Sequence, residues 1–222
     1  MRRLITSAAI VTCLAISGLF GPRVAGAAGL GLYGAAGSGD ATWDSDYSDG
    51  NSSKVDKDVR FRDFGIILST LSSETSVFDY RFNIGAGSLK AMPGRGTHTY
   101  NLHGVVVDND FGFGIIRTSA LRVWLGPEVR IAHRTGDDGS NGVTYRHVKQ
   151  YGAGLGPVLG MDVNLGAGLF LALKGGFLAN YYEGTGDNVQ PAGSDADFHV
   201  RETIGYLQVG FIFRFGQAAG RM

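Results

Sequence analysis

Five histidines are the residues of this chain with the most evident chemistry: His98, His103, His133, His147 and His199. An imidazole beside a serine or a carboxylate acts as a general base, and groups of imidazoles bind metal ions. The sequence contains no H-E-x-x-H motif, no G-x-S-x-G motif and no His-Ser-Glu spacing. We therefore expect these histidines to lie exposed near outer strand ends or loops, with no catalytic, metal or cofactor role.

A second set of ionisable residues occupies positions that alternate with bulky apolar ones. Its members are Asp63, Arg81, Asp110, Glu128, Arg130 and Lys174. Because charges in a narrow interior of low dielectric constant must be paired, we expect a structural network of ion pairs that plugs the interior. We also expect Arg81, Glu128 and Lys174 to share one network. A gated, narrow ion path and a catalytic carboxylate pair remain as alternatives.

Alternation with a period of two defines the elements that position these residues. It is clearest at the end of the chain, where Leu207, Val209, Phe211, Phe213 and Phe215 alternate with Gln208, Gly210, Ile212 and Arg214. In a β-strand this period places the two sets on opposite faces. Similar runs predict eight strands at about 28–36, 59–70, 76–90, 97–116, 121–134, 145–164, 169–183 and 198–215.

The segments between these runs are polar and predict loops. Residues 37–58 are acidic and contain Trp43 and Tyr47, so we expect a mobile, solvated loop, with binding of divalent cations or lipopolysaccharide as the alternative. Residues 135–143 and 184–197 are expected to be loops as well. Within the strands, Asp108-Asn109-Asp110 and Pro127 each predict a local bulge.

The N-terminus has the pattern of a secretory signal. Arg2 and Arg3 precede an apolar stretch from Leu4 to Phe20, and Ala25-Gly26-Ala27 follows. This pattern predicts a signal peptide over residues 1–27 that is cleaved after Ala27. An uncleaved anchor and a lipoprotein attached at Cys13 are the less favoured alternatives. Residues 28–222 then form one domain.

The composition of residues 28–222 excludes several classes of function. They contain no cysteine, which excludes disulfides and cysteine-based metal sites. Loss of the three arginines of residues 1–27, from totals of 20 basic and 20 acidic residues, leaves a net charge of about −3. That charge does not suggest a nucleic-acid surface.

The same region has the properties of a chain that crosses a membrane with strands. It has no run of 18 apolar residues and is rich in glycine, which disfavours helices. In lipid every backbone N–H and C=O must be paired within the protein. The prediction is therefore an all-β fold, a closed antiparallel up-and-down transmembrane β-barrel of eight strands. The alternative is a soluble sandwich or lipocalin-like barrel, whose outer face would carry more charge and less glycine.

These alternating strands resemble the small outer-membrane β-barrel family, similar to the transmembrane domain of outer-membrane protein A. The resemblance covers about residues 28–215 and rests on architecture. It implies a signal in the last strand, read by the barrel-assembly machinery and carried here by Tyr206, Phe211, Phe213 and Phe215. The extension Gly216–Met222 departs from the pattern of that family, which ends on the aromatic residue.

The resemblance also implies location and function. It predicts a monomeric integral protein of the outer membrane, in contact with membrane lipid and lipopolysaccharide, without a nucleic-acid partner. The expected role is non-enzymatic: structural, adhesive or weakly porin-like. The competing hypothesis is an outer-membrane enzyme that acts on lipid A or surface peptides with histidines and acidic residues at the rim.

Overall fold

The computed structural model describes residues 29–70, 76–93, 98–140, 142–190 and 193–215. The signal peptide over residues 1–27, the lipoprotein alternative at Cys13 and the extension Gly216–Met222 lie outside the described residues. No helix among the described residues has the length and apolar character needed to cross a membrane.

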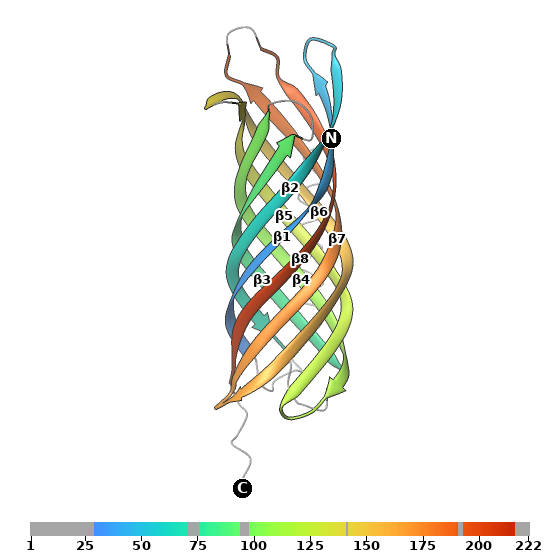
Figure 1. The fold of residues 1–222 in the computed structure, drawn as a ribbon, viewed down its shortest axis with the longest axis vertical. Coiled ribbons are helices and arrows are strands. Elements are labelled where there is room, and N and C mark those ends of the chain that lie inside the picture. The colour runs from blue at the N-terminus through green and yellow to red at the C-terminus, as the bar shows by residue number, and fades with distance from the viewer. Residues whose placement is uncertain (1–28, 71–75, 94–97, 141, 191–192, 216–222) are drawn as a thin grey trace, which may run out of the picture.

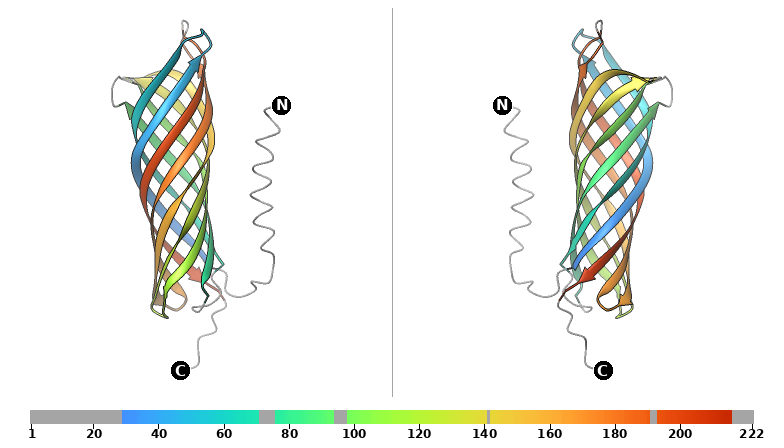
Figure 2. Two further views of the ribbon diagram at one scale, coloured as in Figure 1. Left: turned by 90° about the vertical axis from the view of Figure 1, so that its right-hand side faces the viewer. Right: turned by 90° about the vertical axis from the view of Figure 1, so that its left-hand side faces the viewer.

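Eight antiparallel strands form a closed barrel, in which each strand pairs with its neighbours in sequence and the last pairs with the first (Figure 1). The strands are β1 (Gly29–Tyr47), β2 (Ser52–Ser69), β3 (Phe78–Pro93), β4 (Thr99–Arg117), β5 (Leu121–Ser140), β6 (Val143–Gly166), β7 (Leu169–Asn188) and β8 (Ala196–Arg214). Closure runs from Gly29, opposite Arg214, to Tyr47, opposite Ala196. The predicted fold class is therefore confirmed. The strands are strongly tilted, and the barrel is much longer than it is wide (Figure 2).

The strands are longer than predicted, and three predicted loops are wrong. Residues 37–47 continue β1 and residues 52–58 begin β2, so the acidic segment is mostly strand. Residues 135–140 and 184–188 likewise extend β5 and β7. The apolar alternation ends early because the outward side chains there are polar. The inward positions nevertheless keep the period of two, as the buried Ala41, Trp43 and Ser45 show.

Two tight turns illustrate how neighbouring strands are joined at the two ends of the barrel. Residues 48–51 join β1 to β2, and the Asn51 backbone N–H donates to the Asp49 carboxylate (3.0 Å). Hydrogen bonds from the backbone and the side chain of Asn51 hold the pKa of Asp49 below its usual value, and Ser194 makes a smaller contribution in the same direction. At the opposite end, Gly166, Ala167 and Gly168 connect β6 to β7 with positive φ angles, a conformation that glycine adopts without strain.

The two predicted bulges are also wrong. Asp108 and Asp110 continue the inward face of β4, and the β4–β5 register shifts instead between Gly114 and Ile116. Pro127 lies opposite Pro157 in a β5–β6 register that is continuous from Leu121 to Asp138 and shifts only beyond it, between Asp138 and Gly139. On the β4 side, the pairing resumes in the same register on both sides of Pro127. The missing donor is thus accommodated without an inserted residue.

The outer wall of the barrel carries a belt of apolar side chains. Residues from all eight strands contribute to it, and the most exposed are Leu32, Phe64, Ile115, Leu155, Phe177 and Leu207. The inner face combines buried aromatic residues with buried charges. A water-soluble barrel would have the reverse arrangement, whereas lipid is the solvent that favours this one.

Candidate functional site

Charged side chains from four strands meet in the middle of the barrel, and we call them the central cluster. It contains Asp63 (β2), Asp108 and Asp110 (β4), Glu128 and Arg130 (β5), and Lys174 (β7), all with an exposed fraction of 5% or less. Each residue lies at a position that alternates with the apolar belt, which explains why all of them point inward. The barrel interior is too narrow for these groups to remain solvated independently.

Arg130 connects most of the carboxylates in the central cluster. Its Nε and Nη2 donate to the two oxygens of Asp108 at 2.7 and 3.0 Å. Its Nη1 lies 3.5 Å from Asp63 Oδ2, and its Nη2 lies 3.8 Å from Glu128 Oε1. A planar guanidinium with donors on three sides is suited to this arrangement. The rings of Phe61 and Tyr206 lie 5.1 and 5.6 Å from the Arg130 guanidinium carbon.

Lys174 joins the remaining carboxylates. Its Nζ lies 3.1 and 3.2 Å from the two oxygens of Asp110, and 3.2 Å from Glu128 Oε2. Asn83 also donates to Asp110 (3.0 Å). The Tyr206 hydroxyl donates to Glu128. The central cluster therefore contains four carboxylates and two cations, so each cation serves more than one acid.

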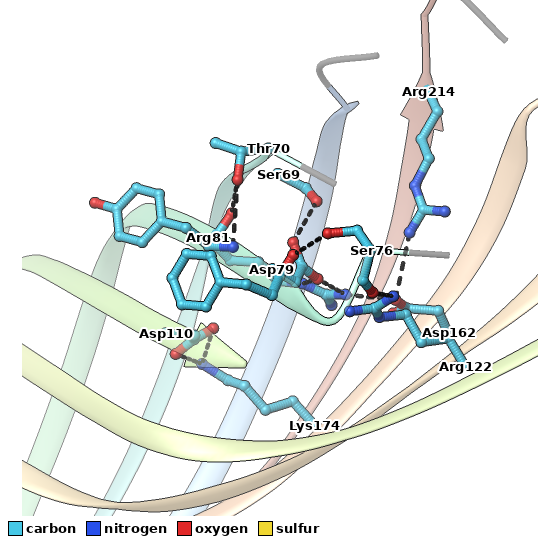
Figure 3. A network of polar contacts seen from close by, with 12 residues as sticks. Ser69, Thr70, Ser76, Asp79, Arg81, Asp110, Arg122, Asp162, Lys174 and Arg214 are labelled. Carbon is cyan, nitrogen blue, oxygen red and sulfur yellow. Dashed lines mark hydrogen bonds and ion pairs between the residues drawn. The ribbon is translucent and has the colours of Figure 1, made fainter. Parts of the chain in front are cut away.

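A second group of charges, the terminal cluster, lies toward the end of the barrel where β1 begins and β8 ends. Figure 3 shows Arg81 between Asp79 and Asp162, with Arg214 reaching the same Asp162 (3.4 Å). Ser69 donates to Asp79 (3.2 Å). These residues come from β2, β3, β6 and β8, so the cluster ties together opposite sides of the barrel.

Among the described residues, Arg81 forms ion pairs with Asp79 and Asp162 and none with Glu128 or Lys174, although it lies opposite Asp110 in the β3–β4 register. Arg81 belongs to the terminal cluster, whereas the Asp110–Lys174 pair is separate from it (Figure 3). The Arg81 guanidinium packs over the Trp124 ring (4.7 Å) instead. Residue parity predicts that all three point inward, but parity carries no information on their height along the tilted strands.

A third group of polar residues fills the barrel on the other side of the central cluster. Arg134 lies 3.9 Å from Glu202, which also accepts a hydrogen bond from Asn180 (2.8 Å). The Tyr182 ring lies 5.0 Å from the Arg134 guanidinium carbon. Beyond it, Trp43 and Tyr100 stack with ring centroids 4.1 Å apart and are buried. Trp43 is therefore part of the packed interior and not of a solvated loop.

Sequence reasoning missed several interior charges. They are Lys57, Asp79, Asp108, Arg122, Arg134, Asp138, Asp162, Glu202 and Arg214. All occupy inward positions by parity, so the same signal that identified the six predicted residues applies to them. The alternation is weak before Asp162, because four of the five inward positions that directly precede it on β6 are glycines. Gly160 leaves space for Trp124, whose ring would lie 2.1 Å from a Cβ at that position.

Four of the five histidines lie on strands, and His98 lies in the connection directly before β4; all five are toward the end of the barrel that is remote from β1's first residue. His98 Nδ1 lies 3.2 Å from Asp138 Oδ1, and His147 Nδ1 lies 2.7 Å from Asp137 Oδ1. Within the described ranges, no serine hydroxyl is hydrogen-bonded to either imidazole, and no group of three or more metal-ligating side chains occurs.

The predicted assembly signal divides between the two faces of β8. Phe211, Phe213 and Phe215 are exposed on the outer wall. Tyr206 does not belong with them, because its even position turns it inward, where it is buried against Glu128. An aromatic residue at an even position cannot share a face with aromatic residues at odd positions of the same regular strand.

Comparison with known proteins places this fold among outer-membrane proteins. No protein-family model matches the sequence, and no curated protein matches it. The structure is similar to that of the outer membrane protein OprG from Pseudomonas aeruginosa, with a TM-score of 0.66 and 12% identity, over 86% of this chain and 96% of that chain. Outer membrane protein AlkL (TM-score 0.46, 10% identity, 87% and 93% covered) and Neisserial surface protein A (0.36, 15%, 83% and 98%) are more distant.

At these identities the likeness concerns the fold alone, and it rests on OprG. A closed ring of eight strands with an apolar outer belt and a charged interior defines the class of this protein: an eight-stranded outer-membrane β-barrel. Its location is the bacterial outer membrane, where the apolar belt is in contact with lipid.

Proposed function

We propose that this protein is a non-enzymatic, monomeric outer-membrane barrel whose lumen is closed by its own side chains, and that it has a structural or adhesive role. The central cluster is the observation that carries the proposal. Six charged side chains from four strands are buried there and linked by contacts of 2.7–3.8 Å. An ion that crossed the barrel would have to break these pairs without receiving equivalent ligands.

The outer part of the barrel suggests where such a role is carried out. Above the apolar belt the strands continue with outward polar residues, such as Asp44, Lys54 and Arg201, which form ion pairs on the outer wall. This extension presents a rigid, charged surface outside the membrane, which is suited to adhesive contacts with another surface. A rigid strand scaffold loses less conformational entropy on contact than a mobile loop.

Biogenesis completes the proposal. Residues 1–27 direct export and are removed, residues 28–222 form the mature protein, and Phe211, Phe213 and Phe215 are recognised by the barrel-assembly machinery. N-terminal sequencing of the protein extracted from membranes tests the first step. A mature N-terminus at residue 28 is the expected result, and a retained Met1 would contradict it.

Conductance in planar bilayers tests the closed lumen. The wild-type protein is expected to give little or no steady conductance. As a matched variant, Glu128→Ser with Lys174→Ser removes one charge of each sign and shortens two interior side chains. It should conduct more than wild type, because the pair no longer blocks the path. Large, steady wild-type conductance would overturn the proposal and favour a pore.

A rim enzyme is the second candidate, favoured by the His147–Asp137 pair at 2.7 Å and the His98–Asp138 pair at 3.2 Å. A carboxylate that orients an imidazole is one part of a hydrolytic site. A nucleophilic side chain hydrogen-bonded to the imidazole is another part, and the described residues provide none for His98 or His147. Incubation with fluorogenic peptides and with lipid A should release no product. Product release that is lost in His98→Ala or His147→Ala would establish the enzyme.

A further inference from the structure

Three outward-facing cations on β2 and β3 have no acidic partner among the residues that the structure describes. Arg60, Arg62 and Lys90 are exposed, and no carboxylate of the described residues forms an ion pair with them. Other outward cations differ in this respect. Lys54 and Arg201 both pair with Asp44, and Lys149 pairs with Asp187 (3.6 Å). The three unpaired cations therefore form a distinct surface, which we call the β2–β3 basic patch.

The register of the barrel brings these charges together instead of separating them. Arg60 lies directly opposite Lys90, and Arg62 lies opposite Ser88. On the other side, Arg60 and Arg62 face the small residues Ser38 and Ala36 of β1. Like charges directly opposite each other on neighbouring strands are destabilising. An anion bound between them would remove this repulsion.

The height of the patch identifies the kind of anion. On β2, Arg62 follows directly above the belt residues Phe64, Ile66 and Leu68 on the outward face. The six residue steps from Arg62 to Leu68, at about 3.3 Å each and tilted by about 40°, cover roughly 15 Å of bilayer. The apolar band of such barrels is about 25 Å tall. The backbone of Arg62 therefore lies within the apolar band, and its side chain must extend so that the guanidinium reaches the level of the headgroups.

We propose that Arg60, Arg62 and Lys90 form a binding site for the phosphate groups of lipid A in the outer leaflet. Phosphate is the anionic group at the level of the headgroups, and guanidinium groups bind it through two parallel hydrogen bonds. The site lies toward the end of the barrel opposite Gly29 and Arg214. The proposal rests on the outward orientation of that end in the outer membrane, and it is independent of whether the lumen conducts.

Thermal unfolding in nanodiscs with and without lipid A tests the site. The site variant carries Arg60→Gln, Arg62→Gln and Lys90→Gln. The control variant carries Lys54→Gln, Lys149→Gln and Arg201→Gln, which removes the same charge from cations that have carboxylate partners. Lipid A in phosphatidylcholine should raise the unfolding temperature of the wild type and of the control variant, and leave that of the site variant unchanged.

A second comparison separates loss of binding from loss of folding. In phosphatidylcholine alone the site variant should unfold at the same temperature as wild type or higher, because the repulsion between Arg60 and Lys90 is removed. Native mass spectrometry should detect lipid A retained on wild type and absent from the site variant. Equal gains in unfolding temperature for all three proteins, or equal retention, would overturn the proposal.

Two further lipids determine the chemistry of recognition. Dephosphorylated lipid A should have no effect on the wild type if phosphate is the recognised group. Phosphatidylglycerol should raise the unfolding temperature less than lipid A does. An equal effect of phosphatidylglycerol would show general charge attraction and overturn the assignment to lipid A. Because nanodiscs are symmetric and no conductance is measured, this result does not depend on the proposed closure of the lumen.

Discussion

Lys174 is central to the charge balance of the barrel interior because acids outnumber cations around it. Its Nζ lies within 3.2 Å of oxygens of both Asp110 and Glu128. Arg130 is occupied mainly by the bidentate contact with Asp108 and by Asp63. Loss of one carboxylate therefore leaves every cation with another partner, whereas loss of Lys174 leaves Asp110 without an ion pair to a cation of the described residues and leaves Glu128 only the longer contact with Arg130 (3.8 Å).

This asymmetry predicts unequal effects of the two matched neutralisations. Lys174→Met should lower the free energy of unfolding by roughly 3–5 kcal/mol, the cost of breaking a buried pair by removing one partner. Glu128→Gln should lower the free energy of unfolding by about 1 kcal/mol. Lys174 still pairs with Asp110, and the new amide oxygen still accepts a hydrogen bond from the Tyr206 hydroxyl. Urea titration of the protein in lipid vesicles measures both. Equal costs would show that Lys174 is not shared between the two acids.

At the scale of the element, each strand separates lipid from the interior by the parity of its residues. On β5, Leu125 is 48% exposed on the outer wall, between Phe113 of β4 and Leu159 of β6. Its neighbour Trp124 is 1% exposed, inside the barrel. A shift of the strand by one residue would exchange these environments, so the apolar belt specifies the register of the whole sheet.

Leu125→Arg should impair membrane assembly, because an arginine near the midplane of the lipid face costs roughly 2–4 kcal/mol. Thr135→Arg is the matched control, since residue 135 faces the same way ten residues further along β5, beyond the belt. It should assemble like wild type. The fraction of protein that folds into vesicles is measured by its mobility on a gel. Normal assembly of Leu125→Arg would mean that this part of β5 does not face lipid.

At the scale of the whole molecule, closure of β1 onto β8 gives the barrel its stability in lipid. Every strand has two neighbours, so no edge exposes unpaired N–H and C=O groups to the hydrocarbon. The interior clusters add contacts between strands that are far apart in the ring, as Arg81 of β3 does with Asp162 of β6. Opening the barrel requires the loss of a complete ladder together with these pairs.

Heat-modifiable mobility is the expected consequence. In cold SDS the ladder should persist, so unboiled protein should migrate differently from boiled protein on a gel. Extraction from membranes should require detergent and should resist carbonate washing, because the belt is in contact with lipid. Release as a soluble periplasmic protein, or identical mobility before and after boiling, would exclude a closed barrel in the membrane.

The strands and the direction of their side chains follow from the alternation of residue types along the chain. Alternation of bulky apolar residues with glycine and charge was sufficient to predict eight strands, a closed barrel and the inward direction of Asp63, Glu128 and Lys174. It failed for residues 37–47, which continue β1. The reason is physical: outside the membrane no lipid selects apolar side chains, so the outward face of an extended strand has the composition of a loop.

Which inward charges meet depends on the packing of the whole barrel. Residues at equivalent positions in sequence lie at different heights because the strands are tilted and staggered, so Arg81 joins Asp162 while Lys174 joins Asp110 and Glu128. The same stagger places Arg60 opposite Lys90 on the outer wall. Parity is a property of one strand, whereas contact across a barrel depends on the register of all eight, which closure alone fixes.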